Sequence, residues 1–137
     1  MSDSGQKLAA LTCRGVLGTS LLLHGLQKFG MLGGIGIRRF ADYLDGLGVV
    51  MPTAAAWVVA SGEVLCGAAL FVGCFHRVAA GFAIVVMTAA IWLVHGSTYF
   101  LPRGLEYQLA LIAVAISVYA FGPGPFAYKV ELKQNRK

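Results

Sequence analysis

Charged residues are scarce in this sequence. Of its 137 residues, 11 are Lys or Arg and 6 are Asp or Glu, so that charged residues make up 12%, whereas hydrophobic residues make up 58%. A soluble domain usually carries about 25% charged residues, because a small domain has a large surface to cover with polar groups. The composition therefore argues against a soluble globule, a disordered chain and a nucleic-acid-binding protein, and it predicts an integral membrane protein.

Sequence signatures of disulfide, metal and haem chemistry are also missing. Cys13, Cys66 and Cys74 form no Cys-x-x-Cys pair. On one helix, Cys66 and Cys74 would lie about 12 Å apart, which is too far for a disulfide. The sequence contains neither a zinc-ligand spacing nor a haem-ligating pair. We therefore interpret the cysteines as small apolar packing residues and expect no metal site.

Long apolar segments dominate the rest of the sequence. A membrane-spanning helix needs about 20 mostly apolar residues, and four stretches qualify: about 8–29, 53–74, 78–94 and 105–121. They predict that residues 1–137 form a single all-α domain, a transmembrane four-helix bundle in a lipid bilayer. Small residues let helices approach closely in lipid. Tight packing is therefore expected at the glycines of these segments: Gly15, Gly18, Gly25, Gly62, Gly67, Gly73 and Gly81.

The connection between the first and second spans contains a short amphipathic segment. Within residues 37–44, apolar side chains recur at helical spacing at Ile37, Phe40, Ala41 and Leu44, with the charges mostly on the other face. This pattern predicts a short helix that lies at the membrane surface as a connector. The alternative is that the helix folds over the mouth of the bundle as a lid.

The distribution of Lys and Arg predicts the orientation in the membrane. Four spans place both termini on one side, and cytoplasmic segments are enriched in Lys and Arg. We therefore predict cytoplasmic termini in a bacterial inner membrane, with a basic cytoplasmic tail at 126–137. The residues that support this are Lys7, Arg77, Lys129, Lys133, Arg136 and Lys137 on the terminal side, against Lys28, Arg38, Arg39 and Arg103 on the other.

Charges inside the spans are the strongest functional pointers, because a charge within a bilayer costs about 2.5 kcal/mol or more. The helical rise places Arg14 about 9 Å from the terminal side and Glu63 near the midplane. We expect these two residues to form a deep charge pair or a proton relay. The alternatives are that Arg14 snorkels to its near surface and that Glu63 is a structural strut, either neutral or paired with an arginine.

A second polar group is predicted near the opposite surface, in the outer leaflet. His24 and Lys28 share one face of the first span with Arg14, within an arc of about 80°. The candidates for binding a ligand there are His24, Lys28, His95, Glu106, Trp92 and Tyr107, with Tyr99 nearby. Each has a simpler interpretation. Lys28 would be an interfacial anchor, His95 an ordinary helix end, and the aromatic residues part of an aromatic belt.

The order of these residues resembles the DoxX family. The resemblance covers about residues 8–128 and departs from the family pattern at Pro125-Phe126-Ala127, where a Ser-Leu-Asp-like end is common. The matching features are Arg14-x9-His24-Gly25-x2-Lys28, Leu47-Gly48 leading to Pro52, Glu63-x3-Gly67 followed by Gly73 and Arg77, Glu106 at the start of the last span, and Gly122-Pro123-Gly124 at its end.

The resemblance implies a four-helix membrane protein that serves as a subunit or partner of membrane redox systems, such as thiosulfate:quinone oxidoreductases. A membrane quinone would then receive hydrogen bonds from His24 and Lys28, and Glu106 and Glu63 would relay protons. Electrons would come from another redox protein, because the chain carries no electron carrier, and whether the chain is an enzyme stays open. The alternatives are a non-catalytic scaffold or assembly factor, a self-associated copy as partner, and a small-solute or proton pathway.

Overall fold

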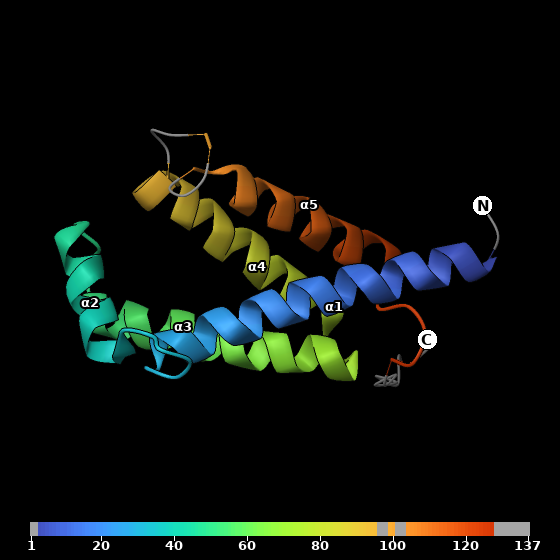
Figure 1. Cartoon of the computed structure of the whole chain (residues 1–137), viewed down its shortest axis with the longest axis horizontal. Coiled ribbons are helices and arrows are strands. Elements are labelled where there is room, and N and C mark those ends of the chain that lie inside the picture. Colours follow the sequence, from blue (N-terminus) through green and yellow to red (C-terminus); the bar gives the residue numbers. More distant parts are fainter. Residues whose placement is uncertain (1–2, 96–98, 101–103, 128–137) are drawn as a thin grey trace, which may run out of the picture.

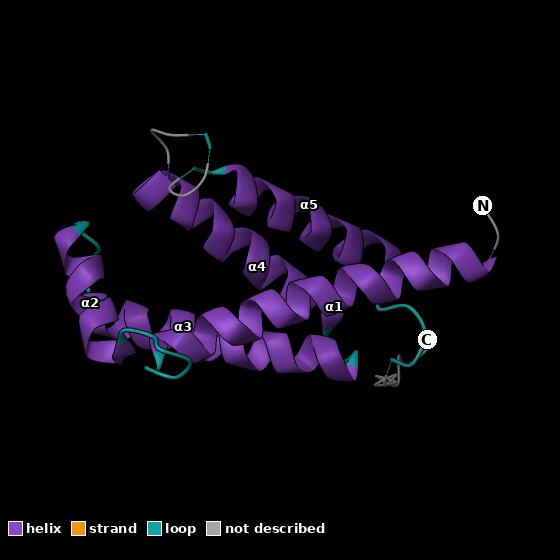
Figure 2. Ribbon diagram, viewed as in Figure 1, coloured by secondary structure: helices purple, strands orange, loops and turns teal. Residues whose placement is uncertain are grey.

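The fold is helical throughout the part of the chain that the structure describes. The computed structural model describes residues 3–95, 99–100 and 104–127 (Figure 1). These residues form helices without any strand (Figure 2), which confirms the all-α prediction for them. The elements are α1 (Asp3–Lys28), α2 (Gly36–Gly46), α3 (Pro52–Val72), α4 (His76–Ala90), the π-helical segment η1 (Ile91–His95) and α5 (Glu106–Phe121).

Three of the described helices are long and apolar enough to cross a membrane. They are Ser4–Lys28 of α1, Pro52–Val72 of α3, and His76–Val94, which combines α4 with η1. The last helix, α5, has 16 residues and extends about 24 Å, which is less than the roughly 30 Å of a bilayer core. The structure therefore supports a multi-pass membrane protein with three full-length spans and a shorter apolar fourth helix.

Helices α1 and α3 form an antiparallel pair whose backbones touch at glycines. A Cβ atom on Gly67 would lie 2.6 Å from the backbone nitrogen of Leu22, and one on Gly25 would lie 2.8 Å from that of Val64. These distances are shorter than van der Waals contact, so only glycine fits at either position. The predicted tight packing thus occurs at this helix pair, whereas the expectation is wrong for Gly15 and Gly81, where a Cβ atom would meet nothing within 4 Å.

A sharp turn at Gly73 separates α3 from α4. Gly73 ends α3 with a φ of 81°, a left-handed conformation that costs glycine nothing, and the Cys74 N–H donates to the Ala69 carbonyl. Beyond the turn, α4 diverges from α3 and packs against α5, which also contacts α1 (Figure 1). The main apolar core lies where these helices meet, at Leu17, Leu21, Leu70, Ala79, Ala80, Ala83, Met87, Leu111, Ala115 and Val118.

Helix α2 packs across the end of α3 that lies far from the chain termini (Figure 1). Its Ala41 and Leu44 are buried against Ala56 of α3, so the helix expected within residues 37–44 is present with one apolar face on α3. At the other end of the molecule, a Cβ on Gly124 would lie 2.8 Å from Ala10, so the segment after α5 returns to the start of α1. Most of the expected basic tail, from residue 128 onward, lies outside the described residues.

Candidate functional site

A cavity of about 460 Å³ lies between the diverging helices α3 and α4, and α1, α2 and α5 complete its walls. Most of its lining is apolar and includes Leu44, Val59, Phe82, Val86, Met87 and Leu93. Six polar or ionisable side chains from α1, α2, α3 and α5 also reach it: His24, Lys28, Tyr43, Glu63, Tyr107 and Gln108. We call this cavity, with these lining residues, the cleft.

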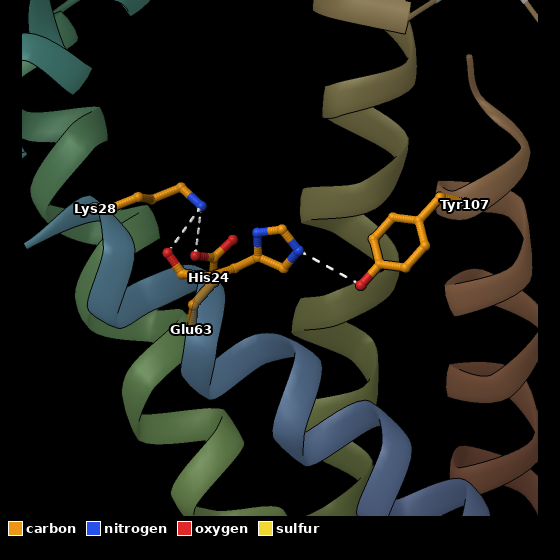
Figure 3. Close-up of polar contacts among 4 residues, drawn as sticks. All are labelled: His24, Lys28, Glu63 and Tyr107. Atoms are coloured by element: carbon orange, nitrogen blue, oxygen red, sulfur yellow. Dashed lines mark hydrogen bonds and ion pairs between the residues drawn. The ribbon is translucent and has the colours of Figure 1, made fainter. Parts of the chain in front are cut away.

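An ion pair joins α1 to α3 at the cleft. The Lys28 Nζ atom donates to Glu63 Oε2 at 2.7 Å and lies 3.5 Å from the carbonyl oxygen of His24 (Figure 3). The Glu63 side chain is only 2% exposed and that of Lys28 is 18% exposed. The Phe40 ring of α2 lies under the ammonium group, with its centroid 5.2 Å from Nζ. The ammonium group of Lys28 thus balances the charge of the buried Glu63 carboxylate, and α2 covers the ion pair.

His24 and Tyr107 bridge the cleft from α1 to α5. The Tyr107 hydroxyl lies 3.4 Å from His24 Nε2, and the ring centroids are 6.0 Å apart (Figure 3). The 3.4 Å between the hydroxyl oxygen and Nε2 is longer than in a strong hydrogen bond. Both groups can donate or accept, so either is able to exchange this contact for one with a ligand.

Gln108, the residue after Tyr107, is a buried polar residue of the cleft that the sequence analysis missed. Its side chain is buried, and its Oε1 atom has no hydrogen-bond partner among the described residues. Buried acceptors without a donor are rare in proteins. The signal in the sequence was a single amide within the mostly apolar stretch 105–121, which charge-based reasoning overlooks because glutamine carries no charge.

The expected pair between Arg14 and Glu63 is wrong. Arg14 is buried, but its guanidinium donates to the carbonyl oxygens of Pro123 at 2.7 Å and Pro125 at 3.3 Å. The cause is the register of the antiparallel helices. Arg14 lies opposite Gly73, which is about 15 Å further along the chain direction of α3 than Glu63. Glu63 is therefore left for Lys28.

Arg14 should instead stabilise the return of the chain after α5. We expect Arg14→Met to lower the free energy of unfolding by about 3 kcal/mol, because two charge-assisted hydrogen bonds to the carbonyl groups of the half-buried Pro123 and Pro125 are lost. Thermal unfolding in detergent micelles measures the loss, with Arg77→Met, at an exposed arginine of α4, as the control. A double-mutant cycle should also give little coupling between Arg14 and Glu63. Equal effects of the two arginine substitutions would contradict this role.

Three of the six ligand-binding candidates line the cleft, namely His24, Lys28 and Tyr107. Trp92 does not line it and is 84% exposed on η1, as in the aromatic-belt interpretation. Glu106 is half-buried at the start of α5, where its backbone N–H donates to the Tyr99 carbonyl, and it does not line the cleft. The side chain of His95 lies outside what the structure describes.

The described part of the chain contains no cluster of three His, Cys, Asp or Glu side chains that could hold a metal ion. Several of its polar side chains instead line an apolar-walled cleft between membrane-length helices. These features define the class: a multi-pass helical membrane protein with an internal cleft.

The chain belongs to the DoxX family. The DoxX family model matches residues 9–96, which is more than half of the chain and includes the ion pair of Lys28 and Glu63 together with His24. Tyr107 and Gln108 lie beyond the matched range. Comparisons with curated proteins and with solved structures found no match.

Proposed function

We propose that this protein is a four-span membrane subunit that binds a membrane quinone in the cleft and serves a membrane oxidoreductase system as a partner. The observation that carries the proposal is the distribution of polarity in the cleft: its walls are mostly apolar, and its few polar groups come from α1, α2, α3 and α5. A quinone has the same distribution, with an isoprenoid tail and two carbonyl oxygens on a ring.

The residues present fit such a ligand. Small-molecule sites usually measure about 300–1,000 Å³ and combine apolar walls with a few placed polar groups, and the cleft has about 460 Å³. His24 and Tyr107 offer hydrogen-bond donors for carbonyl oxygens, and Phe40 and Phe82 offer aromatic surface for a ring. When bound, a quinone supplies two-electron, two-proton chemistry, and its electrons would come from a partner redox protein.

Of the two glutamates expected from the sequence to relay protons, the proposal keeps that role for Glu63 alone. Glu63, which lines the cleft beside Lys28, is placed to hold or pass a proton, whereas Glu106 lies away from the cleft. We further propose that α5 acts as the fourth span despite its length. Both termini would then be cytoplasmic in the inner membrane, and α2 would lie at the opposite surface over the outer-leaflet cleft.

Binding of decylubiquinone tests the proposal. We expect saturable binding to the purified protein by isothermal titration calorimetry in dodecyl maltoside micelles, with empty micelles as the blank. His24→Ala and Tyr107→Phe should each weaken the affinity about tenfold, because each removes about one net hydrogen bond. Trp92→Phe, outside the cleft, is the control and should bind as the wild type does. Absence of saturable binding to the wild type would contradict the proposal.

The ion pair favours a second candidate, a non-catalytic membrane scaffold or assembly factor. Lys28 and Glu63 satisfy each other and can hold α1 on α3 without any ligand. If the protein is a scaffold, His24→Ala should retain activity in a cell-based complementation assay, while Gly67→Leu should abolish it by separating the helices. If it binds a quinone, both substitutions should impair activity.

A further inference from the structure

We infer that the cleft opens sideways into the lipid between α3 and α4, and that the apolar chain of its ligand passes through this opening. We call it the side opening and define it by Val58, Val85 and Ala89, which line the cleft. The ligand is then exchanged with the acyl region of the bilayer rather than with water. The inference rests on the proposed function and adds to it the entry route and the residues that admit the chain.

Helices α3 and α4 separate just beyond a close contact between Gly62 and Phe82. The Phe82 ring of α4 packs directly on Gly62 of α3, where a Cβ atom would clash with it. Both helices run away from the turn at Gly73 (Figure 1), so the next positions on the two facing surfaces are Val58 of α3 and Val85 of α4. These valines line the cleft, yet they are 64% and 67% exposed. The helices therefore no longer cover each other at this level, and the cleft is open there.

The contacts at the other sides of the cleft place polar groups opposite the side opening. Around the cleft, α1 packs on α3, α3 on α4, α4 on α5 and α5 on α1. The side between α1 and α3 is closed where Gly25 lies directly against Val64, and the side between α1 and α5 is bridged by His24 and Tyr107. In this order the α1–α5 side faces the α3–α4 side. A ligand whose ring contacts His24 and Tyr107 therefore points its chain at the side opening.

The side opening lies at a depth where the membrane is apolar. Val58 lies about 9 Å along α3 from Pro52, the first residue of the helix. Helix α3 and the combined helix of α4 and η1 are long and apolar enough to cross a bilayer, so a surface exposed at this depth meets acyl chains rather than water. All three side chains of the opening are aliphatic. The opening thus suits an aliphatic chain and offers no side-chain hydrogen bond to a polar headgroup.

An isoprenoid chain attached to a quinone ring is the occupant that suits both ends of this space. The inner end presents His24 and Tyr107, which can hydrogen-bond ring oxygens, and the outer end is aliphatic. A phospholipid acyl chain would match only the outer end, because its headgroup stays at the membrane surface. A helix from a second copy of the chain would fill the opening without reaching the polar groups.

Titrations with a chain-bearing and a chain-free quinone test the inference, with decylubiquinone and duroquinone as the probes. Val58→Trp/Val85→Trp should weaken decylubiquinone binding in dodecyl maltoside micelles about tenfold, because the two indole rings occupy the path of the chain. Duroquinone, whose ring carries only methyl groups, lies wholly within the cleft and should bind as it does to the wild type. The matched control is Leu65→Trp/Val78→Trp, at residues of the same helices that are 69% and 67% exposed and do not line the cleft. It should leave both affinities unchanged.

A photoreactive quinone tests the same point on the wild-type protein, where no substitution can disturb folding. The probe is a decylubiquinone analogue with a diazirine in the middle of its chain. On illumination it should label α3 or α4 beside Val58 or Val85, and an excess of decylubiquinone should suppress the labelling. Mass spectrometry of the digested protein locates the labelled residues.

The outcomes separate the inference from the proposed function. Unchanged decylubiquinone binding to Val58→Trp/Val85→Trp, an equal loss for both quinones, or labelling confined to α1, α2 or α5 overturns the side opening while quinone binding stands. Loss of a copurified phospholipid or of a dimer from the tryptophan variant in native mass spectrometry, with decylubiquinone binding unchanged, assigns the opening to that occupant instead. Failure of both quinones to bind the wild type overturns the proposed function itself.

Discussion

Replacing Lys28 with methionine should lower the free energy of unfolding by about 3–5 kcal/mol, since this is the usual cost of removing one partner from a buried ion pair. Glu63 is 2% exposed, and without Lys28 its carboxylate would be left in an apolar environment or would have to take up a proton. Glu63→Gln should lower the free energy of unfolding by less than Lys28→Met does. Lys28 is 18% exposed at the end of α1, and its flexible chain can turn the ammonium group toward water.

The double variant Lys28→Met/Glu63→Leu distinguishes a buried charge from a loss of packing. Because the desolvation cost of both ions disappears, we expect it to recover most of the stability lost in Lys28→Met. Unfolding in mixed detergent micelles with increasing dodecyl sulfate measures Lys28→Met, Glu63→Gln, Glu63→Leu and the double variant. Arg38→Met, on an exposed position of α2, is the matched control and should change little. If the double variant is as unstable as the sum of its single changes, the ion pair is not what holds the two helices.

The spans could be predicted from the sequence because hydrophobicity and length act along a single helix. An apolar helix of about 20 residues satisfies its own backbone hydrogen bonds across a bilayer without help from its neighbours, and the expected stretches 53–74 and 78–94 correspond closely to Pro52–Val72 and His76–Val94. The helix around 37–44 could be predicted for the same reason, because the spacing of its apolar residues lies within the segment itself and does not depend on the helices packed against it. The first helix, α1, begins at Asp3, earlier than the expected residue 8, because its polar first turn is also helical.

The partners of the buried charges could not be predicted in this way. They depend on the register between helices, which the close contacts at glycines determine and which hydrophobicity does not encode. In that register, Glu63 of α3 lies beside the turn of α1 that precedes Lys28. The Lys28 side chain reaches Glu63 because helical side chains lean toward the N-terminus of their helix. The same register moves Arg14 out of reach of Glu63.

Gly67→Ala should show that the glycine contacts hold this register. A Cβ on Gly67 would lie 2.6 Å from the backbone nitrogen of Leu22 and 2.9 Å from the carbonyl oxygen of Gly18. Backbone atoms cannot rotate away as a side chain does, so α1 and α3 must move apart. We expect a loss of about 2–3 kcal/mol for alanine and failure to fold for Gly67→Leu. The midpoint of unfolding by dodecyl sulfate measures the loss.

Gly15→Ala is the matched control on α1, because a Cβ there meets nothing within 4 Å. It should be neutral or stabilise the helix by up to about 1 kcal/mol, as expected when glycine is replaced within a helix. Since His24 and Lys28 reach the cleft from α1, Gly67→Ala should also weaken decylubiquinone binding, whereas Gly15→Ala should leave it unchanged. Equal effects of the two alanine substitutions on stability would mean that helix propensity, rather than the close approach of α1 and α3, determines how the cleft is held.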